Sequence, residues 1–114
     1  MGTEISSPTT ETFKRAVLFF NRQRYAAAAR TLAPITDVAP RNMAVRMLLA
    51  RSYYFSAQLS RAEGELREIL SAEPQDAHAH LLLGRTLERQ GRLAEAAPHL
   101  RLADAMTAWD LVVV

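Results

Sequence analysis

The sequence contains no cysteine, so it forms no disulfide and offers no thiolate for nucleophilic catalysis or metal binding. No apolar run approaches the roughly 18 residues that a membrane-spanning helix needs, and the first ten residues lack the apolar core of a secretory signal. The first six residues fit the loose myristoylation pattern, which is too short and too common to carry an inference. These absences lead us to expect a cytoplasmic protein.

Motifs for catalysis are also missing. The sequence has no phosphate-binding loop, nucleophile elbow or dinucleotide fingerprint. His78 and His80 stand two residues apart, on different sides of a helix, so they cannot chelate a metal as an i, i+4 pair does. We expect His80 to be packed and His78 to face solvent or a binding groove. The sequence therefore predicts no enzyme activity, no cofactor and no metal site.

The sequence does contain a repeat with a period of 34 residues. Similar residue types recur at this interval in three consecutive blocks: Ala16, Ala50 and Gly84; Phe19, Tyr53 and Leu87; Tyr25, Leu59 and Leu93; Ala28, Ala62 and Ala96; Leu32, Leu66 and Leu100; Pro40 and Pro74. This period is the length of a paired-helix unit that cannot bury its apolar face alone and must stack on a neighbour. We predict an all-α stack with units at 9–42, 43–76 and 77–110.

Capping residues indicate where the helices begin. Asn42 and Asp76, at equivalent repeat positions, predict helices that start at residues 43 and 77. Ser7-Pro8, or the two threonines that follow, predict the first helix after a flexible segment of residues 1–8. Ser60 and Glu63 have the capping-box spacing, which predicts a helix start at Ser60.

Two prolines fall inside predicted helices. Pro34 removes a hydrogen bond and its ring clashes with the carbonyl of Arg30, so we expect a kink or an early end there. Pro98 lies near the start of the last helix, where proline costs less.

These residues resemble the tetratricopeptide repeat family. Each unit keeps a small residue at positions eight and twenty and a large residue at position eleven. The resemblance implies an α-solenoid of three helix-turn-helix repeats, wound as a right-handed superhelix, that acts as a protein-interaction scaffold. The tryptophan favoured at position four is Thr12, Arg46 or His80 here, so the packing at that position must differ.

In similar proteins, the first helix of each unit lines a concave groove through positions 2, 5, 9, 12 and 13. On this chain, these positions are Thr10, Phe13, Val17, Phe20 and Asn21; Ala44, Met47, Arg51, Tyr54 and Phe55; and His78, Leu81, Arg85, Glu88 and Arg89. The implied groove is apolar and aromatic at its N-terminal end and rich in arginine toward its C-terminal end.

Such a groove suits a short peptide with apolar anchors and with carboxylates that face the arginines. This hypothesis predicts that reversing the charges of Arg85 and Arg89 abolishes partner capture. The alternative for Phe13, Phe20 and Tyr54 is that they only pack between units.

One subclass of the family holds the C-terminal carboxylate of chaperones with lysine, asparagine and arginine residues. The matching positions here are Phe13, Val17, Leu48, His78 and Leu82. The sequence therefore excludes a co-chaperone of that kind.

Nucleic-acid binding is the alternative of another class, because the sequence pI is about 9.5 and thirteen of the fourteen basic residues are arginine. Backbone binding requires a continuous basic stripe, whereas arginine alternates with glutamate after residue 60. The twenty alanines indicate that the arginine content reflects a GC-rich, bacterial genome. We rank nucleic-acid binding below protein binding.

The C-terminal end of the stack has no evident capping helix. Asp110 matches Asn42 and Asp76 in register and resembles the cap of a fourth unit, but only the apolar tail 111–114 follows. An open last unit leaves three outcomes: the tail with Trp109 folds back over it, two copies form a homodimer there, or the tail is exposed.

Overall fold

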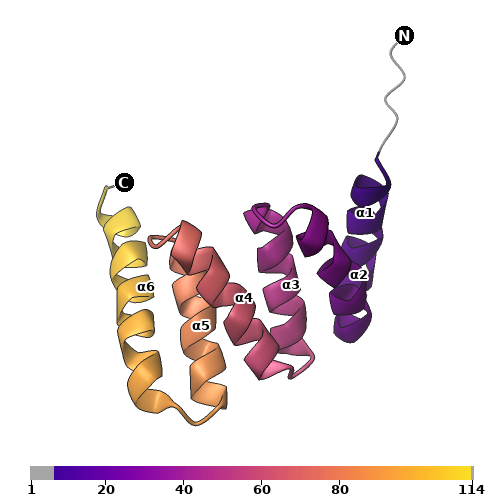
Figure 1. The fold of residues 1–114 in the computed structure, drawn as a ribbon. Coiled ribbons are helices and arrows are strands. Elements are labelled where there is room, and N and C mark those ends of the chain that lie inside the picture. The colour runs from indigo at the N-terminus through magenta and orange to yellow at the C-terminus, as the bar shows by residue number, and fades with distance from the viewer. Residues whose placement is uncertain (1–6, 114) are drawn as a thin grey trace.

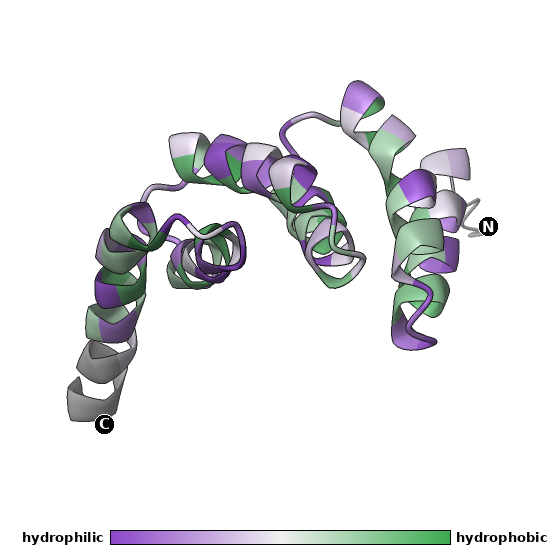
Figure 2. Ribbon diagram, turned by 90° about the horizontal axis from the view of Figure 1, so that it is seen from below, coloured by the Kyte–Doolittle hydropathy of each residue, from purple (hydrophilic) through white to green (hydrophobic). Residues whose placement is uncertain are grey.

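The 34-residue period appears in space as three pairs of helices. The computed structural model describes residues 7–113, which form six α-helices and, within that range, no strand. They are α1 (Pro8–Asn21), α2 (Tyr25–Val38), α3 (Met43–Phe55), α4 (Leu59–Ala72), α5 (Ala77–Arg89) and α6 (Leu93–Val113). α1 packs on α2, α3 on α4 and α5 on α6, and contacts of α2 with α3 and of α4 with α5 join the pairs. The resulting curved row confirms the predicted all-α solenoid (Figures 1 and 2).

Side-chain caps start the first helix of each pair, as predicted. Ser7, Asn42 and Asp76 each accept a hydrogen bond from the backbone N–H three residues ahead, at 3.1, 3.1 and 2.9 Å. Pro8 is the first residue of α1. The segment predicted to be flexible therefore includes two residues that belong to the start of this helix.

The predicted capping box of α4 is wrong. α4 begins at Leu59, and Gln58 occupies the N-cap position without a side-chain cap bond. Glu63 instead accepts hydrogen bonds from Arg92 and Arg67, at 2.7 and 2.9 Å. Its carboxylate therefore joins the second helix pair to the third, and the Arg92 bond is the main reason that the pKa of Glu63 is lowered.

The turn within each pair has the same backbone geometry. Gln23, Ala57 and Gly91, spaced by 34 residues, have φ angles of 61°, 62° and 78°. The next residue in each turn donates its N–H to the carbonyl of repeat position eleven, at 2.8, 2.8 and 2.9 Å. Only the third unit has glycine at this left-handed position, where other residues carry a cost of about 1–2 kcal/mol.

The structure excludes the early helix end, one of the two outcomes expected at Pro34, and corrects the prediction of a cap at Asp110. α2 continues through Pro34 to Val38, so the proline does not end the helix early. α6 continues to Val113, so Asp110 lies inside a helix and does not cap a fourth unit. The backbone of residues 111–113 extends α6 and does not fold back as a separate tail, and residue 114 lies outside the described residues.

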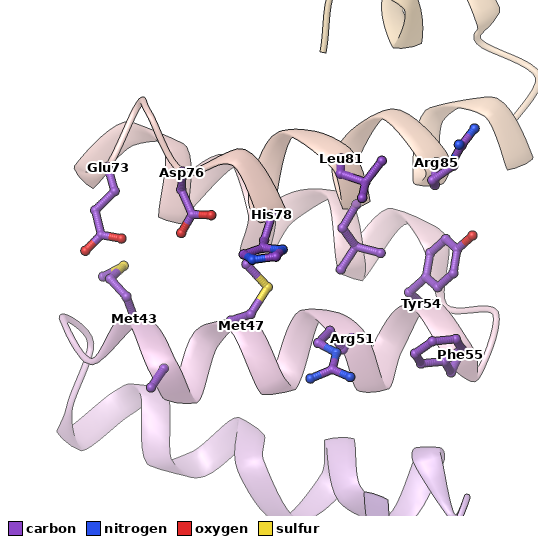
Figure 3. Close-up of a pocket in the computed structure, with 12 residues that line it drawn as sticks. Met43, Met47, Arg51, Tyr54, Phe55, Glu73, Asp76, His78, Leu81 and Arg85 are labelled. Carbon is purple, nitrogen blue, oxygen red and sulfur yellow. The ribbon is translucent and has the colours of Figure 1, made fainter. Parts of the chain in front are cut away.

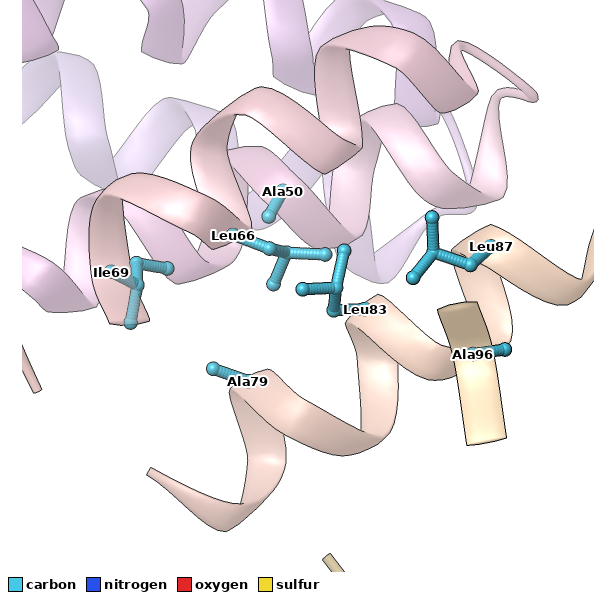
Figure 4. Packing of buried hydrophobic residues seen from close by; sticks show 7 residues of the cluster. All are labelled: Ala50, Leu66, Ile69, Ala79, Leu83, Leu87 and Ala96. Atoms are coloured by element: carbon cyan, nitrogen blue, oxygen red, sulfur yellow. The ribbon is translucent and has the colours of Figure 1, made fainter. Parts of the chain in front are cut away.

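Two apolar clusters hold the stack together, and both straddle a junction between units. The first contains Ala16, Ala29, Leu32, Ile35, Val45 and Leu49. The second contains Ala50, Leu66, Ile69, Ala79, Leu83, Leu87 and Ala96 (Figure 4). Each cluster contains residues from two successive units. No unit can therefore be removed without exposing the apolar core that it shares with its neighbour.

The small residues at positions eight and twenty are buried where the two helices of a pair meet. Their small side chains allow these helices to approach closely. Ala16, Ala28, Ala50 and Ala62 have no exposed surface. At Gly84 the approach leaves no room for a side chain, because an added Cβ would meet the Cδ2 atom of Leu100 and lie 2.6 Å from its Cγ atom. Alanine therefore fits at this position in the first two units but not in the third.

The two helical glycines give a matched test of this close approach. Gly64→Ala should raise the free energy of unfolding by about 0.5–1 kcal/mol, because alanine favours a helix and nothing lies within 4 Å of its Cβ. Gly84→Ala should lower it by about 1 kcal/mol or more, because overpacking costs about 1–3 kcal/mol. Urea unfolding followed by circular dichroism measures both. Equal stabilisation by the two substitutions would show that Leu100 does not confine Gly84.

Candidate functional site

A groove lies between α3 and α5, the first helices of the second and third pairs. It encloses a cavity of about 740 Å³, and the turn between α4 and α5 completes its wall (Figure 3). The lining residues are Met43, Ala44, Met47, Arg51, Tyr54, Phe55, Glu73, Asp76, His78, Leu81, Leu82 and Arg85. We call this cavity the α3–α5 groove. Its volume lies within the roughly 300–1,000 Å³ of ligand-binding pockets.

The α3–α5 groove differs in charge from one end to the other. Figure 3 shows Glu73 and Asp76 together at the end where Met43 begins α3. Arg85 lies toward the opposite end, beside the rings of Tyr54 and Phe55. Between the two ends, Figure 3 shows Met47 and Leu81 with His78, and Arg51 lies on α3 between Met47 and Phe55. The groove is therefore acidic at one end, mainly apolar in the middle, and basic and aromatic toward the other end.

The groove brings together eight of the fifteen predicted groove positions. These are Ala44, Met47, Arg51, Tyr54, Phe55, His78, Leu81 and Arg85. The other seven do not line it: Thr10, Phe13, Val17, Phe20, Asn21, Glu88 and Arg89.

Two of the predicted aromatic residues, Phe13 and Phe20, pack between helices and do not line the groove. Phe13 packs against the core cluster of the first two units. The Phe20 ring lies edge-on to the rings of Tyr25 and Phe55, with centroids 5.1 and 6.0 Å apart. Because these rings come from α1, α2 and α3, Phe20 joins the first helix pair to the second. Tyr54 does line the groove.

Four lining residues were missed by the sequence interpretation: Met43, Glu73, Asp76 and Leu82. That interpretation followed five positions of each unit's first helix, whereas Glu73 and Asp76 belong to the turn before α5. Asp76 was recognised only as a helix cap. The repeat register could have drawn attention to it, because it stands at the last position of its unit beside the start of a groove-lining helix.

The arginines near the groove differ in what they already contact. Arg85 pairs with Glu88 at 3.0 Å, and both side chains are exposed. Arg89 donates to the carbonyl of Tyr54 at 3.0 Å and lies 4.8 Å from the centroid of its ring. Arg51 lies 4.7 Å from the centroid of Phe20 and, in the described part of the chain, has no carboxylate at ion-pair distance. Arg51 is therefore the cation best placed to receive a new carboxylate.

Repeat position four is polar in place of the family's tryptophan. Arg46 donates from Nε to the carbonyl of Pro40 and from Nη1 to Glu65, both at 2.7 Å. His80, 34 residues later, makes contacts at the same offsets: Nε2 lies 2.7 Å from the carbonyl of Pro74, and Nδ1 lies 3.0 Å from Nδ1 of His99. In both units, the side chain ties the preceding turn to the second helix of the pair. We call these two arrangements the position-four clamps.

The contacts of His80 indicate which of its ring nitrogens carries the proton. A carbonyl accepts, so Nε2 of His80 donates to Pro74. In the neutral ring, Nδ1 then accepts from the Nδ1–H of His99. Burial is the largest cause that lowers the pKa of His99, followed by the charges of His80 and Arg67. His80 is buried as predicted, whereas the exposed His78 lines the groove.

Over the residues that the structure describes, no three histidine, aspartate or glutamate side chains gather closely enough to hold a metal ion. No described helix combines the length and apolar character needed to cross a membrane.

The curved row of helix pairs with a groove between equivalent helices defines a helical-repeat interaction scaffold. The chain belongs to the tetratricopeptide repeat family, whose profile matches residues 13–56 and 47–108. No curated protein sequence matches it.

Solved structures of MamA share the fold. A MamA point mutant is 20% identical with a TM-score of 0.82, and the match covers 90% of this chain and 75% of the mutant. MamA MSR-1 is 20% identical, with a TM-score of 0.83 and coverage of 90% and 59%. MamA from Desulfovibrio magneticus RS-1 is 18% identical, with a TM-score of 0.81 and coverage of 90% and 58%. The chain thus spans less than two thirds of the last two proteins, and these identities establish the fold alone.

The His80–His99 contact predicts a pH-dependent stability. Because folding lowers the pKa of His99, the folded state binds fewer protons, and stability falls as pH drops below the unfolded-state value of about 6.5. The free energy of unfolding should decrease from about pH 7.5 to about pH 5.5 more steeply in the native chain than in His99→Gln, because glutamine at position 99 does not titrate. Urea titrations at both pH values measure the two slopes. Equal slopes would show that His99 does not carry the effect, and His78→Gln, at an exposed position, is the control.

Proposed function

We propose that this chain is a non-catalytic interaction module that binds a peptide segment of a partner protein in the α3–α5 groove. The observation that carries the proposal is a cavity with an apolar stretch and with Arg51, which has no carboxylate partner among the described residues, on the side toward the aromatic rings (Figure 3). Apolar anchors of a peptide would fill the space beside Met47 and Leu81, and a carboxylate would approach Arg51. A cytoplasmic site of action is part of this proposal.

The side chains at the arginine end support binding energetically. Arginine and aromatic residues dominate the energy of many interfaces, and Phe55 is 49% exposed although it is large and apolar. The exposed ion pair between Arg85 and Glu88 contributes at most about 1 kcal/mol, so a ligand carboxylate can replace Glu88 at little cost. Of the three arginines expected to face a carboxylate, Arg89 is held against Tyr54 outside the groove, so the proposal keeps Arg51 and Arg85 as the anchors.

Charge reversal tests groove binding. Arg51→Glu combined with Arg85→Glu should weaken the binding of a capped fluorescent peptide of three leucines and one aspartate by about tenfold or more, since a hydrogen bond to a charged group contributes about 1.5–3 kcal/mol. Fluorescence anisotropy gives the dissociation constants, and circular dichroism checks that the variant is folded.

Two single variants serve as controls for the reversal. Arg101→Glu makes the same charge change on the exposed surface of α6, and Arg89→Glu makes it beside the groove. Both should bind nearly as tightly as the native chain. Equal losses in all of the variants would indicate a general effect of net charge and would exclude an anchor at Arg51.

Self-association through the last unit is the second candidate. α6 is at the end of the row and packs against α5, and no other described helix lies on its outer side (Figure 1). Leu102 and Leu93 on α6 are 43% and 65% exposed. If two copies associate there, Leu102→Glu should convert a dimer to a monomer in light scattering. A native chain that is monomeric at high concentration would exclude this candidate.

A further inference from the structure

We infer that the α3–α5 groove selects a partner segment with opposite charges at its two ends: a lysine or arginine side chain beside Glu73 and Asp76, and a carboxylate beside Arg51 and Arg85. This inference rests on the proposed function and specifies the chemistry of the partner. Apolar residues of the segment lie between its two charges.

The acidic end of the groove carries negative charge that the described residues do not neutralise. No ion pair in the described part of the chain includes Glu73 or Asp76, and Figure 3 shows the cations that line the groove, Arg51 and Arg85, away from these carboxylates and toward the other end. Asp76 caps α5 through Oδ1, so its charge offsets the positive end of that helix. Glu73 follows the negative end of α4, where its charge has no such compensation. A basic side chain of the partner is the group that this end would attract.

The basic end attracts a carboxylate because Arg51 has no carboxylate partner in the described part of the chain and Arg85 has only an exposed ion pair with Glu88. A segment with two acidic ends would therefore be repelled at Glu73 and Asp76, and a segment with two basic ends would be repelled at Arg51 and Arg85. Like-charge contacts of this kind exclude wrong partners more effectively than they add affinity for the right one. The groove thus discriminates by the arrangement of charge as well as by its sign.

The separation of the two ends sets the spacing of the partner's charges. Arg51 follows Met43 by eight residues on α3, and Arg85 follows Asp76 by nine residues along α5. At 1.5 Å per residue, these offsets correspond to about 12–14 Å along the helix axes. An extended peptide advances about 3.3 Å per residue, so its opposite charges should stand about four residues apart.

Three capped fluorescent peptides with the same three apolar residues test the inference on the full chain. One has lysine at one end and aspartate at the other, one has aspartate at both ends, and one has lysine at both ends. We expect the peptide with opposite charges to bind about tenfold more tightly than either of the others in fluorescence anisotropy. The difference should shrink at high salt, because exposed charges are screened.

Neutralising the acidic end tests its role. Glu73→Gln with Asp76→Asn removes both charges, while asparagine keeps the oxygen that caps α5. In this variant, the peptide with opposite charges should no longer bind more tightly than the peptide with two aspartates. The peptide with two aspartates should bind this variant more tightly than it binds the native chain. Glu68→Gln with Asp104→Asn, at exposed positions outside the groove, is the matched control and should leave the preference unchanged.

The outcomes separate this inference from the proposed function. If the peptide with two aspartates binds the native chain as tightly as the peptide with opposite charges, the inferred preference for opposite charges is wrong. In that case, a loss of binding in Arg51→Glu/Arg85→Glu would still support peptide binding in the α3–α5 groove. An advantage that survives Glu73→Gln/Asp76→Asn also overturns the inference. If none of the three peptides binds, the proposed groove function fails as well.

Discussion

The close approach of the two helices within each pair is the constraint on which the rest of this structure depends. It is possible because repeat positions eight and twenty carry alanine or glycine, and because leucines such as Leu66 fill the space that remains. Interiors packed to this density tolerate little change in separation. A wider pair would displace α4 relative to α3, and α4 is the helix against which α5 packs. The width of the α3–α5 groove is therefore set by residues that never line it.

Most of the fold could be predicted from the sequence because its determinants are local or repeat in register. Asn42 and Asp76 are caps by residue type and position, and the buried alanines follow from the 34-residue spacing. The Ser60–Glu63 prediction failed because Glu63 has a stronger electrostatic partner, Arg92, whose distance in sequence hides the contact. The end of α6 differs from the prediction because register alone placed a cap at Asp110, whereas residues 111–113 contain no proline or glycine that would stop the helix.

The groove was less predictable than the fold, for a related reason. Repeat positions identify which face of a helix points toward the groove, and this located Met47, Arg51, Tyr54 and Leu81. They do not show which side chains are already engaged by neighbours. Phe20 is held by an aromatic cluster that joins three helices. The acidic end comes from a turn, whose orientation depends on tertiary contacts that no single-unit pattern contains.

Those tertiary contacts connect the position-four clamps to the groove. His80 holds the carbonyl of Pro74, and Pro74 lies between Glu73 and Asp76 in sequence. The same turn therefore has one side bound by a buried histidine and another side that presents two carboxylates to the groove. A tryptophan at position four could fill space there, but its ring N–H is a single donor and could not also bond to the second helix of the pair. Because Arg46 and His80 form two polar contacts each, they orient the turn as well as filling the position. The departure from the family pattern thus positions the acidic end of the α3–α5 groove.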